Sequence, residues 1–231
     1  NSIFINQCKK IFCYSSRIRK FPNKYIDKIQ IINPILKKKI YLYKKSEKKK
    51  SDQKIFLIIG GSQGAKFFQV ELKGLLNQLS KKFNIFIYHQ TNKDNFKHLE
   101  IFYQKNNIPC YLFDFNQSLE KIYNKTDFCI TRAGASTLAE LVYFGVPFLT
   151  IPFPYSKDDH QLYNAQFYKD QNCCWIIEQK DILKKNLFEI ISNIFENQID
   201  IQNKKKAMYK FSLNNTWENN NKLIIKTIYE N

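Results

Sequence analysis

Small residues gather in two segments of this chain, GGSQGA at residues 60–65 and AGASTLAELVYFG at residues 133–145. The two segments hold five of the six glycines and four of the six alanines. Each follows an apolar run and opens a helical pattern, so unpaired backbone N–H groups would face a ligand there. A helix start favours a bound phosphate by about 0.3–1 kcal/mol, and by up to about 2 kcal/mol when partly buried. The sequence therefore predicts an anion site, with Gly61, Gly64 and Gly134 as points of close approach.

The alternative is that both segments are ordinary tight turns and helix caps. GGSQGA by itself fits either interpretation. It is not a Walker loop, because no Gly-Lys-Ser/Thr follows, and it does not have the GxGxxG spacing.

Glu140 also has two interpretations. TLAE, residues 137–140, has the Thr-x-x-Glu form of a capping box, with Thr137 as the cap and Glu140 folding back onto it. Alternatively, the Glu140 carboxylate accepts hydrogen bonds from the two hydroxyls of a ribose, worth about 1.5–3 kcal/mol each. The spacing fits both.

Polar side chains also cluster in DDHQLYNA, residues 158–165, where another helix is expected to begin. Asp158 or Asp159 is predicted to be its N-cap. The amides of Gln161 and Asn164 are suited to reading the hydroxyls of a sugar. A single histidine, His160, beside aspartates makes a weak metal site, and we predict that no metal is bound.

The elements that would position these residues follow from residue 54 onward, where short apolar runs alternate with helical patterns. Strands are expected at 55–61, 84–91, 110–115, 127–133, 147–153 and 173–179. Helices are expected at 65–82, between the second strand and about residue 105, at 118–126, at 136–145 and from about 159. Strands that are apolar throughout are typical of a parallel sheet covered on both faces. The prediction is an α/β fold, a doubly wound Rossmann-like domain with its ligand at the carboxyl edge of the sheet.

Three pieces flank this domain, which we place at residues 54–197. Residues 1–36 hold one amphipathic stretch and two short apolar runs, too little to fold alone. Residues 37–53 are predicted to be a charged linker, and 198–231 to be closing helices anchored by Trp217. No apolar run is long enough to cross a membrane. The chain does not begin with Met, so we expect it to start within a longer protein or to be a trimmed product.

The formal charge of +17 comes almost entirely from lysine, since Arg17, Arg19 and Arg132 are the only arginines. Arginine is the better residue for bidentate contacts with bases and phosphates, so we predict no nucleic-acid partner. A lysine-rich surface is instead attracted to an anionic membrane surface, by about 1 kcal/mol per well-placed residue.

The six cysteines form no CxxC pair and have no histidine at zinc spacing. Cys110, Cys129, Cys173 and Cys174 lie in or beside apolar runs and are expected to be buried thiols in a reducing compartment. His89 and His98 are expected to be structural or surface residues.

Taken together, GGSQGA and TRAGASTLAEL…GVP…IPFPYSKDDHQ…NA closely resemble the MurG family of bacterial N-acetylglucosaminyltransferases. YHQTNKD at 88–94, INPI at 32–35 and NSIFINQ at 1–7 agree with further family segments, so the resemblance runs from Asn1 to about Gln179. It implies a GT-B glycosyltransferase, in which the C-terminal of two Rossmann-like domains holds the nucleotide sugar UDP-GlcNAc. The acceptor would be the undecaprenyl-diphosphate-linked muramyl pentapeptide, at the cytoplasmic face of the bacterial plasma membrane. No cofactor is implied.

The resemblance also implies roles for individual residues. Ser62 would contact the donor diphosphate, and the backbone of Ala135, Ser136, Thr137, Leu138 and Ala139 would cradle the nucleotide. Glu140 would bind the ribose, and Gln161, with His160 or Asn164, would touch the sugar. Asn116 would meet the uracil through its backbone, and Asn1 would lie near the donor sugar.

Two departures from the family pattern stand out. Leu36 occupies the position of the family arginine, with Lys37 beside it as a charge that lacks the bidentate fork. The resemblance implies that residues 1–36 are a remnant of the family's N-terminal acceptor domain. The rest of that domain, including its Gly-rich acceptor loop, has no counterpart in this sequence, so we assign no general base. The alternatives are another GT-B lipid glycosyltransferase, or a non-catalytic UDP-sugar-binding subunit that needs a separate acceptor-binding chain.

Overall fold

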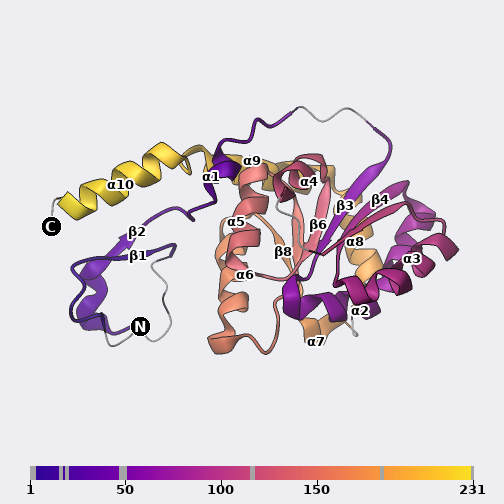
Figure 1. Ribbon diagram of the computed structural model, residues 1–231, viewed down its shortest axis with the longest axis horizontal. Coiled ribbons are helices and arrows are strands. Elements are labelled where there is room, and N and C mark those ends of the chain that lie inside the picture. The colour runs from indigo at the N-terminus through magenta and orange to yellow at the C-terminus, as the bar shows by residue number, and fades with distance from the viewer. Residues whose placement is uncertain are drawn as a thin grey trace.

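The computed structural model of this protein describes residues 4–15, 18, 21–46, 51–114, 118–182 and 185–229, and for residues 61–66 it describes the backbone only. The larger sheet has six parallel strands in the order β5-β4-β3-β6-β7-β8 (Figure 1). They are β3 (Lys54–Ile59), β4 (Ile85–Gln90), β5 (Cys110–Phe113), β6 (Phe128–Thr131), β7 (Phe148–Thr150) and β8 (Trp175–Ile176). The predicted doubly wound α/β fold is confirmed.

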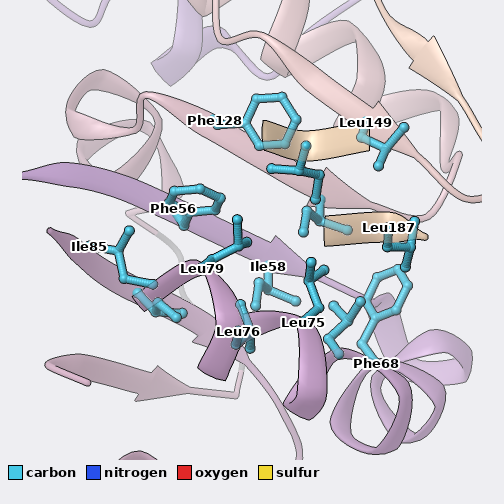
Figure 2. Packing of buried hydrophobic residues seen from close by; sticks show 14 of the residues in the cluster. Phe56, Ile58, Phe68, Leu75, Leu76, Leu79, Ile85, Phe128, Leu149 and Leu187 are labelled. Atoms are coloured by element: carbon cyan, nitrogen blue, oxygen red, sulfur yellow. The ribbon is translucent and has the colours of Figure 1, made fainter. Parts of the chain in front are cut away.

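Helices cover both faces of this sheet. Alternation along β3 sends Phe56 and Ile58 to one face and Leu57 and Ile59 to the other. The first face is covered by α2 (Gly61–Lys82), α3 (Phe96–Lys105) and α8 (Leu187–Glu196), and Figure 2 shows leucines of α2 against Phe56 and Ile58. The second face is covered by α4 (Leu119–Lys125), α5 (Ala135–Phe144), α6 (His160–Asp170) and α9 (Gln198–Leu213).

Smaller elements complete the fold. They are η2 (Asn23–Lys28), η3 (Lys93–Asn95), η4 (Lys157–Asp159), α1 (Lys38–Tyr41), α7 (Gln179–Ile182) and α10 (Trp217–Tyr229). A separate two-stranded parallel sheet pairs β1 (Ile11–Cys13) with β2 (Ile29–Ile31) and lies beside the main domain in Figure 1. The described residues of this N-terminal piece form the 3-10 helix η2 and no α-helix.

The segment expected to be a charged linker, residues 37–53, contains α1. Ile40 of α1 is only 1% exposed and packs with Leu36 in the core of the second face. The ring of Tyr41 lies 5.6 Å from that of Tyr143 and 6.1 Å from that of Trp217. Trp217, expected as the anchor of the closing helices, therefore contacts this segment.

Some element ends differ from those expected. Helix α2 begins at Gly61 rather than at residue 65, because the glycines form its first turn instead of a separate loop. The strand expected at 173–179 is reduced to Trp175–Ile176. All six cysteines are free; Cys129, Cys173 and Cys174 are buried as expected, whereas Cys110 is only partly buried. Among the described residues, none of the helices combines the length and apolar character needed to cross a membrane.

Candidate functional site

The candidate site lies where the strand order of the main sheet reverses. The chain runs outward from β3 through β4 to β5, then returns to place β6 on the other side of β3. Ile59 and Thr131, the last residues of β3 and β6, are neighbours across this junction. Because α2 begins two residues after Ile59 and α5 begins four residues after Thr131, both helix starts meet at one edge. Such a switch point is the usual ligand crevice of open α/β sheets.

The first turn of α5 has backbone N–H donors without a partner among the described residues. No side chain caps this helix at Gly134, and its first intrahelical bond runs from the Leu138 N–H to the Gly134 carbonyl at 3.0 Å. The N–H groups of Ala135, Ser136 and Thr137 therefore lie outside the ladder of the helix. Ala135 and Ser136 are exposed, whereas the Leu138 and Ala139 side chains are buried in the core. This turn can bind an anion through three backbone donors.

The fold does not require a glycine at position 134. Its φ of −69° and ψ of 129° suit any residue, and a Cβ added there would meet Thr137 Oγ1 at an ordinary 3.8 Å. Gly145, at the other end of α5, has a φ of +67° that disfavours any side chain. The absence of a side chain at Gly134 therefore leaves room for something other than the described chain.

Gly134→Ala is expected to weaken nucleotide binding by about tenfold and to change the free energy of unfolding by less than about 0.5 kcal/mol. Gly145→Ala is the matched control, because a strained left-handed alanine costs about 1 kcal/mol of stability but lies away from the site. Calorimetric titration and thermal unfolding of both variants measure the two effects. Unchanged binding by Gly134→Ala would show that no ligand approaches this glycine.

Glu140 lies one turn further along α5 and is largely buried, with 8% of its surface exposed. Its Oε2 accepts a hydrogen bond of 2.9 Å from the hydroxyl of Tyr123 on α4. The capping-box interpretation is wrong, because the cap is Gly134 and Thr137 lies within the helix. Oε1 has no hydrogen-bond partner among the described residues. A carboxylate with one fixed and one open oxygen can accept a hydrogen bond from a ligand hydroxyl.

The charges around Glu140 act in both directions. Burial raises the pKa of its carboxyl above the usual range, while the Tyr123 hydrogen bond and the charges of Lys37 and Lys39 lower it, and Glu120 raises it. Lys39 forms an ion pair of 3.2 Å with Glu120. Lys37, named from the sequence as a charge beside the site, is exposed and acts on Glu140 through its field.

Two amides of α6 hold the turn between β6 and α5. Gln161 Oε1 accepts from the N–H groups of Ala133, at 3.1 Å, and Phe153, at 3.0 Å. Asn164 Nδ2 donates to the Ala133 carbonyl at 3.0 Å. Both backbone polar groups of Ala133 are thus bound by α6, and Gln161 Nε2 has no partner among the described residues. Gln161 can therefore brace the turn and still donate to a ligand.

Arg132 also supports the turn between β6 and α5. Its Nη1 donates to the carbonyls of Ile151, at 3.1 Å, and Pro152, at 3.2 Å, and its Nη2 donates to Gln179 Oε1 at 2.7 Å. The guanidinium also lies 4.6 Å from the ring of Phe67. Burial lowers the pKa of Arg132 to about 10, which still leaves it charged at neutral pH. The sequence identified Arg132 only as one of three arginines and gave it no role; the structure gives it a positioning role.

Other residues predicted from the sequence lie apart from these contacts or outside the description. Asp159 occupies the N-cap position of α6, as expected, with a left-handed φ of 54° and no side-chain cap bond. His160 is exposed and contacts the Lys157 carbonyl through Nδ1 at 2.8 Å. Gly61, Ser62 and Gly64 lie in the first turn of α2, where side chains are not described, and Asn1 and Asn116 lie outside the described residues.

The remaining histidines do not form a metal site. His89 is buried and its Nδ1 lies 2.7 Å from the hydroxyl of Tyr103, so it is structural, while His98 is exposed. The described residues contain no group of three or more His, Cys, Asp and Glu side chains that could hold a metal ion.

A cavity of about 720 Å³ adjoins the site without reaching Glu140. Its walls include Ala135 and Asn164 on one side, and Tyr14 and Ile31 of the N-terminal piece on the other. The first turn of α5 therefore borders a cavity whose wall includes the aromatic side chains of Tyr14, Tyr163, Phe167 and Tyr168.

Comparisons with known proteins identify the family of this chain. The family model of the glycosyltransferase family 28 C-terminal domain matches residues 55–221. A protein of Pelagibacter ubique (strain HTCC1062) named UDP-N-acetylglucosamine–N-acetylmuramyl-(pentapeptide) pyrophosphoryl-undecaprenol N-acetylglucosamine transferase is 46% identical over the whole chain. A protein of the same name from Rickettsia bellii (strain RML369-C) is 32% identical over 91% of the chain. The chain spans 65% and 61% of the lengths of these two relatives.

Solved structures show the same fold. The MurG crystal structure from Acinetobacter baumannii aligns with 85% of this chain and 54% of its own, with a TM-score of 0.60 and 24% identity. UDP-GlcNAc 2-epimerase from Neisseria meningitidis, solved with UDP-GlcNAc, aligns with 79% of this chain and 45% of its own, with a TM-score of 0.54 and 13% identity. By its matched domain, this chain belongs to glycosyltransferase family 28.

Proposed function

We propose that this chain carries the UDP-GlcNAc-binding half of an inverting peptidoglycan N-acetylglucosaminyltransferase. The observation that supports it most is the pairing, at one switch point, of an uncapped helix start with the half-open carboxylate of Glu140. Three backbone donors suit a diphosphate, and the carboxylate suits a ribose diol. The names of the relatives supply the donor, UDP-GlcNAc, and the lipid-linked muramyl acceptor.

The mechanism in the proposed enzyme is direct displacement of UDP by the acceptor hydroxyl. The first turn of α5 would stabilise the charge that develops on the departing diphosphate, because its donors are fixed before the reaction. Gln161, already held by two backbone groups, would direct its Nε2 donor to a sugar hydroxyl. No general base is assigned to the described residues.

Membrane association belongs to the same proposal. The charge of +17, carried by lysines, would draw the protein to the anionic cytoplasmic face of the plasma membrane, where a lipid-linked acceptor is found. That attraction weakens with salt, so vesicle binding should fall between about 0.05 and 0.5 M salt.

A transfer assay tests the proposed function. The chain is joined to the part of the Pelagibacter relative that lies outside the matched residues, and transfer of labelled GlcNAc to the lipid-linked muramyl acceptor is measured. Transfer from UDP-GlcNAc, and not from UDP-glucose, is expected. Preference for UDP-glucose would instead indicate another lipid glycosyltransferase, and donor binding without any transfer would indicate a subunit that only binds the UDP-sugar.

A further inference from the structure

Tyr123 is the one tyrosine among the described residues whose hydroxyl is hydrogen-bonded to a carboxylate of the candidate site. It lies on α4, 17 residues before Glu140 in the chain, and only 1% of its surface is exposed. Its ring packs 5.5 Å from that of Phe144, at the far end of α5. Both partners of the hydrogen bond are therefore held by packed helices and not by mobile loops.

From this geometry, and resting on the proposed function, we infer that Tyr123 is a positioning residue that presents the Glu140 carboxylate to the ribose diol. A carboxylate has two oxygens, and the Tyr123 hydroxyl occupies Oε2 at 2.9 Å. This bond fixes the rotation of the carboxyl group and leaves Oε1 without a partner among the described residues. A ligand then meets an acceptor that is already oriented, so binding loses less side-chain entropy.

Burial raises the pKa of the Glu140 carboxyl, and several neighbouring groups act against this effect. The hydrogen bond from Tyr123 and the charges of Lys37 and Lys39 lower the pKa of Glu140. The charge of Glu120, which is paired with Lys39, raises it. Burial raises the pKa of Tyr123 well above its usual value, so this hydroxyl keeps its proton and can donate a hydrogen bond to Glu140 Oε2.

The alternative is that Glu140 serves only to satisfy a buried tyrosine. The two roles differ in what they predict for the ribose. A positioning role acts through the diol, whereas a structural role would weaken every ligand of the site equally. UDP and its 2′-deoxy analogue, which lacks one hydroxyl of the diol, separate them.

The test is calorimetric titration of the 231-residue chain and its Tyr123→Phe variant with both nucleotides. Wild type is expected to prefer UDP to 2′-deoxy-UDP, and Tyr123→Phe is expected to bind UDP about three- to tenfold more weakly with little change for the deoxy analogue. In a Glu140→Gln background, Tyr123→Phe should cause no further loss. Tyr103→Phe removes an equally buried hydroxyl bond, to His89, and should change neither affinity.

The pH profile gives a second measurement. Loss of the Tyr123 bond removes one of the influences that lower the pKa of Glu140, so the acid-side fall in UDP affinity should move to higher pH in Tyr123→Phe. Equal losses for UDP and the deoxy analogue, with an unmoved profile, would overturn the positioning role and leave the proposed function standing. If the wild-type chain bound the two nucleotides equally, Glu140 would not bind the ribose diol, and both the positioning role and the proposed function would be overturned.

Discussion

Glu140→Ala should weaken UDP-GlcNAc binding by at least about tenfold while the chain stays folded. Hydrogen bonds from ribose hydroxyls to a carboxylate are worth about 1.5–3 kcal/mol each, and 1.4 kcal/mol corresponds to a factor of ten. The geometry supports the full value, because Oε2 is fixed by Tyr123 and the side chain is largely removed from water. Titration of wild type and variant at one pH and salt concentration measures the loss.

Glu140→Gln is the matched control for this prediction. It keeps the shape and an acceptor for Tyr123 but removes a charge whose burial is unfavourable, as the raised pKa of the carboxyl shows. Its thermal stability should therefore equal or exceed that of wild type, while its affinity still falls. Unchanged affinity in both variants would leave Glu140 with a structural role alone.

Arg132→Lys should lower the free energy of unfolding by about 2–4 kcal/mol, because a lysine cannot reach the three acceptors that the guanidinium joins. Ile151 O, Pro152 O and Gln179 Oε1 lie in two different segments, and leaving a buried acceptor unpaired costs about 1–3 kcal/mol. For a chain of this size, that corresponds to a fall of about 5–15 °C in Tm.

The same substitution should also weaken nucleotide binding, since Arg132 directly precedes the turn that opens α5. Lys82→Ala serves as the control, because it removes an exposed cation paired with Glu196 and should change stability by no more than about 1 kcal/mol. A Tm for Arg132→Lys within 2 °C of wild type, measured by calorimetry, would show that water replaces these bonds and that the brace is weak.

Local sequence pattern was sufficient for the main elements of the fold. The strands from Lys54, Ile85 and Phe128 were predicted because continuous apolar runs ended in glycine or polar residues, and those runs form the centre of the sheet. The two small-residue segments were placed at strand ends, and the strand order brings them to one edge. Helix α2 began earlier than predicted because glycine was taken as a breaker, although it is accepted in a first turn.

What the sequence did not reveal depends on contacts between distant residues. The TLAE pattern suggested a cap at Thr137, yet Glu140 pairs with Tyr123, a contact that no local spacing encodes. Gln161 and Asn164 were assigned to the ligand, whereas both also hold Ala133, 28 and 31 residues away. Tyr123 itself carried no signal beyond being an aromatic residue on a short helix. The positioning roles of Tyr123, Gln161 and Asn164 could therefore be assigned only from the structure.

The most direct test of the central claim is calorimetric titration of this 231-residue chain with UDP-GlcNAc, using UDP-glucose and ADP-ribose as controls. Selective binding of UDP-GlcNAc is the predicted result, because the helix starts, Glu140 and Gln161 all belong to the described part of the chain. A chain that is folded by circular dichroism but binds none of the three would contradict it. In that case, the family resemblance would record a shared fold without a working donor site.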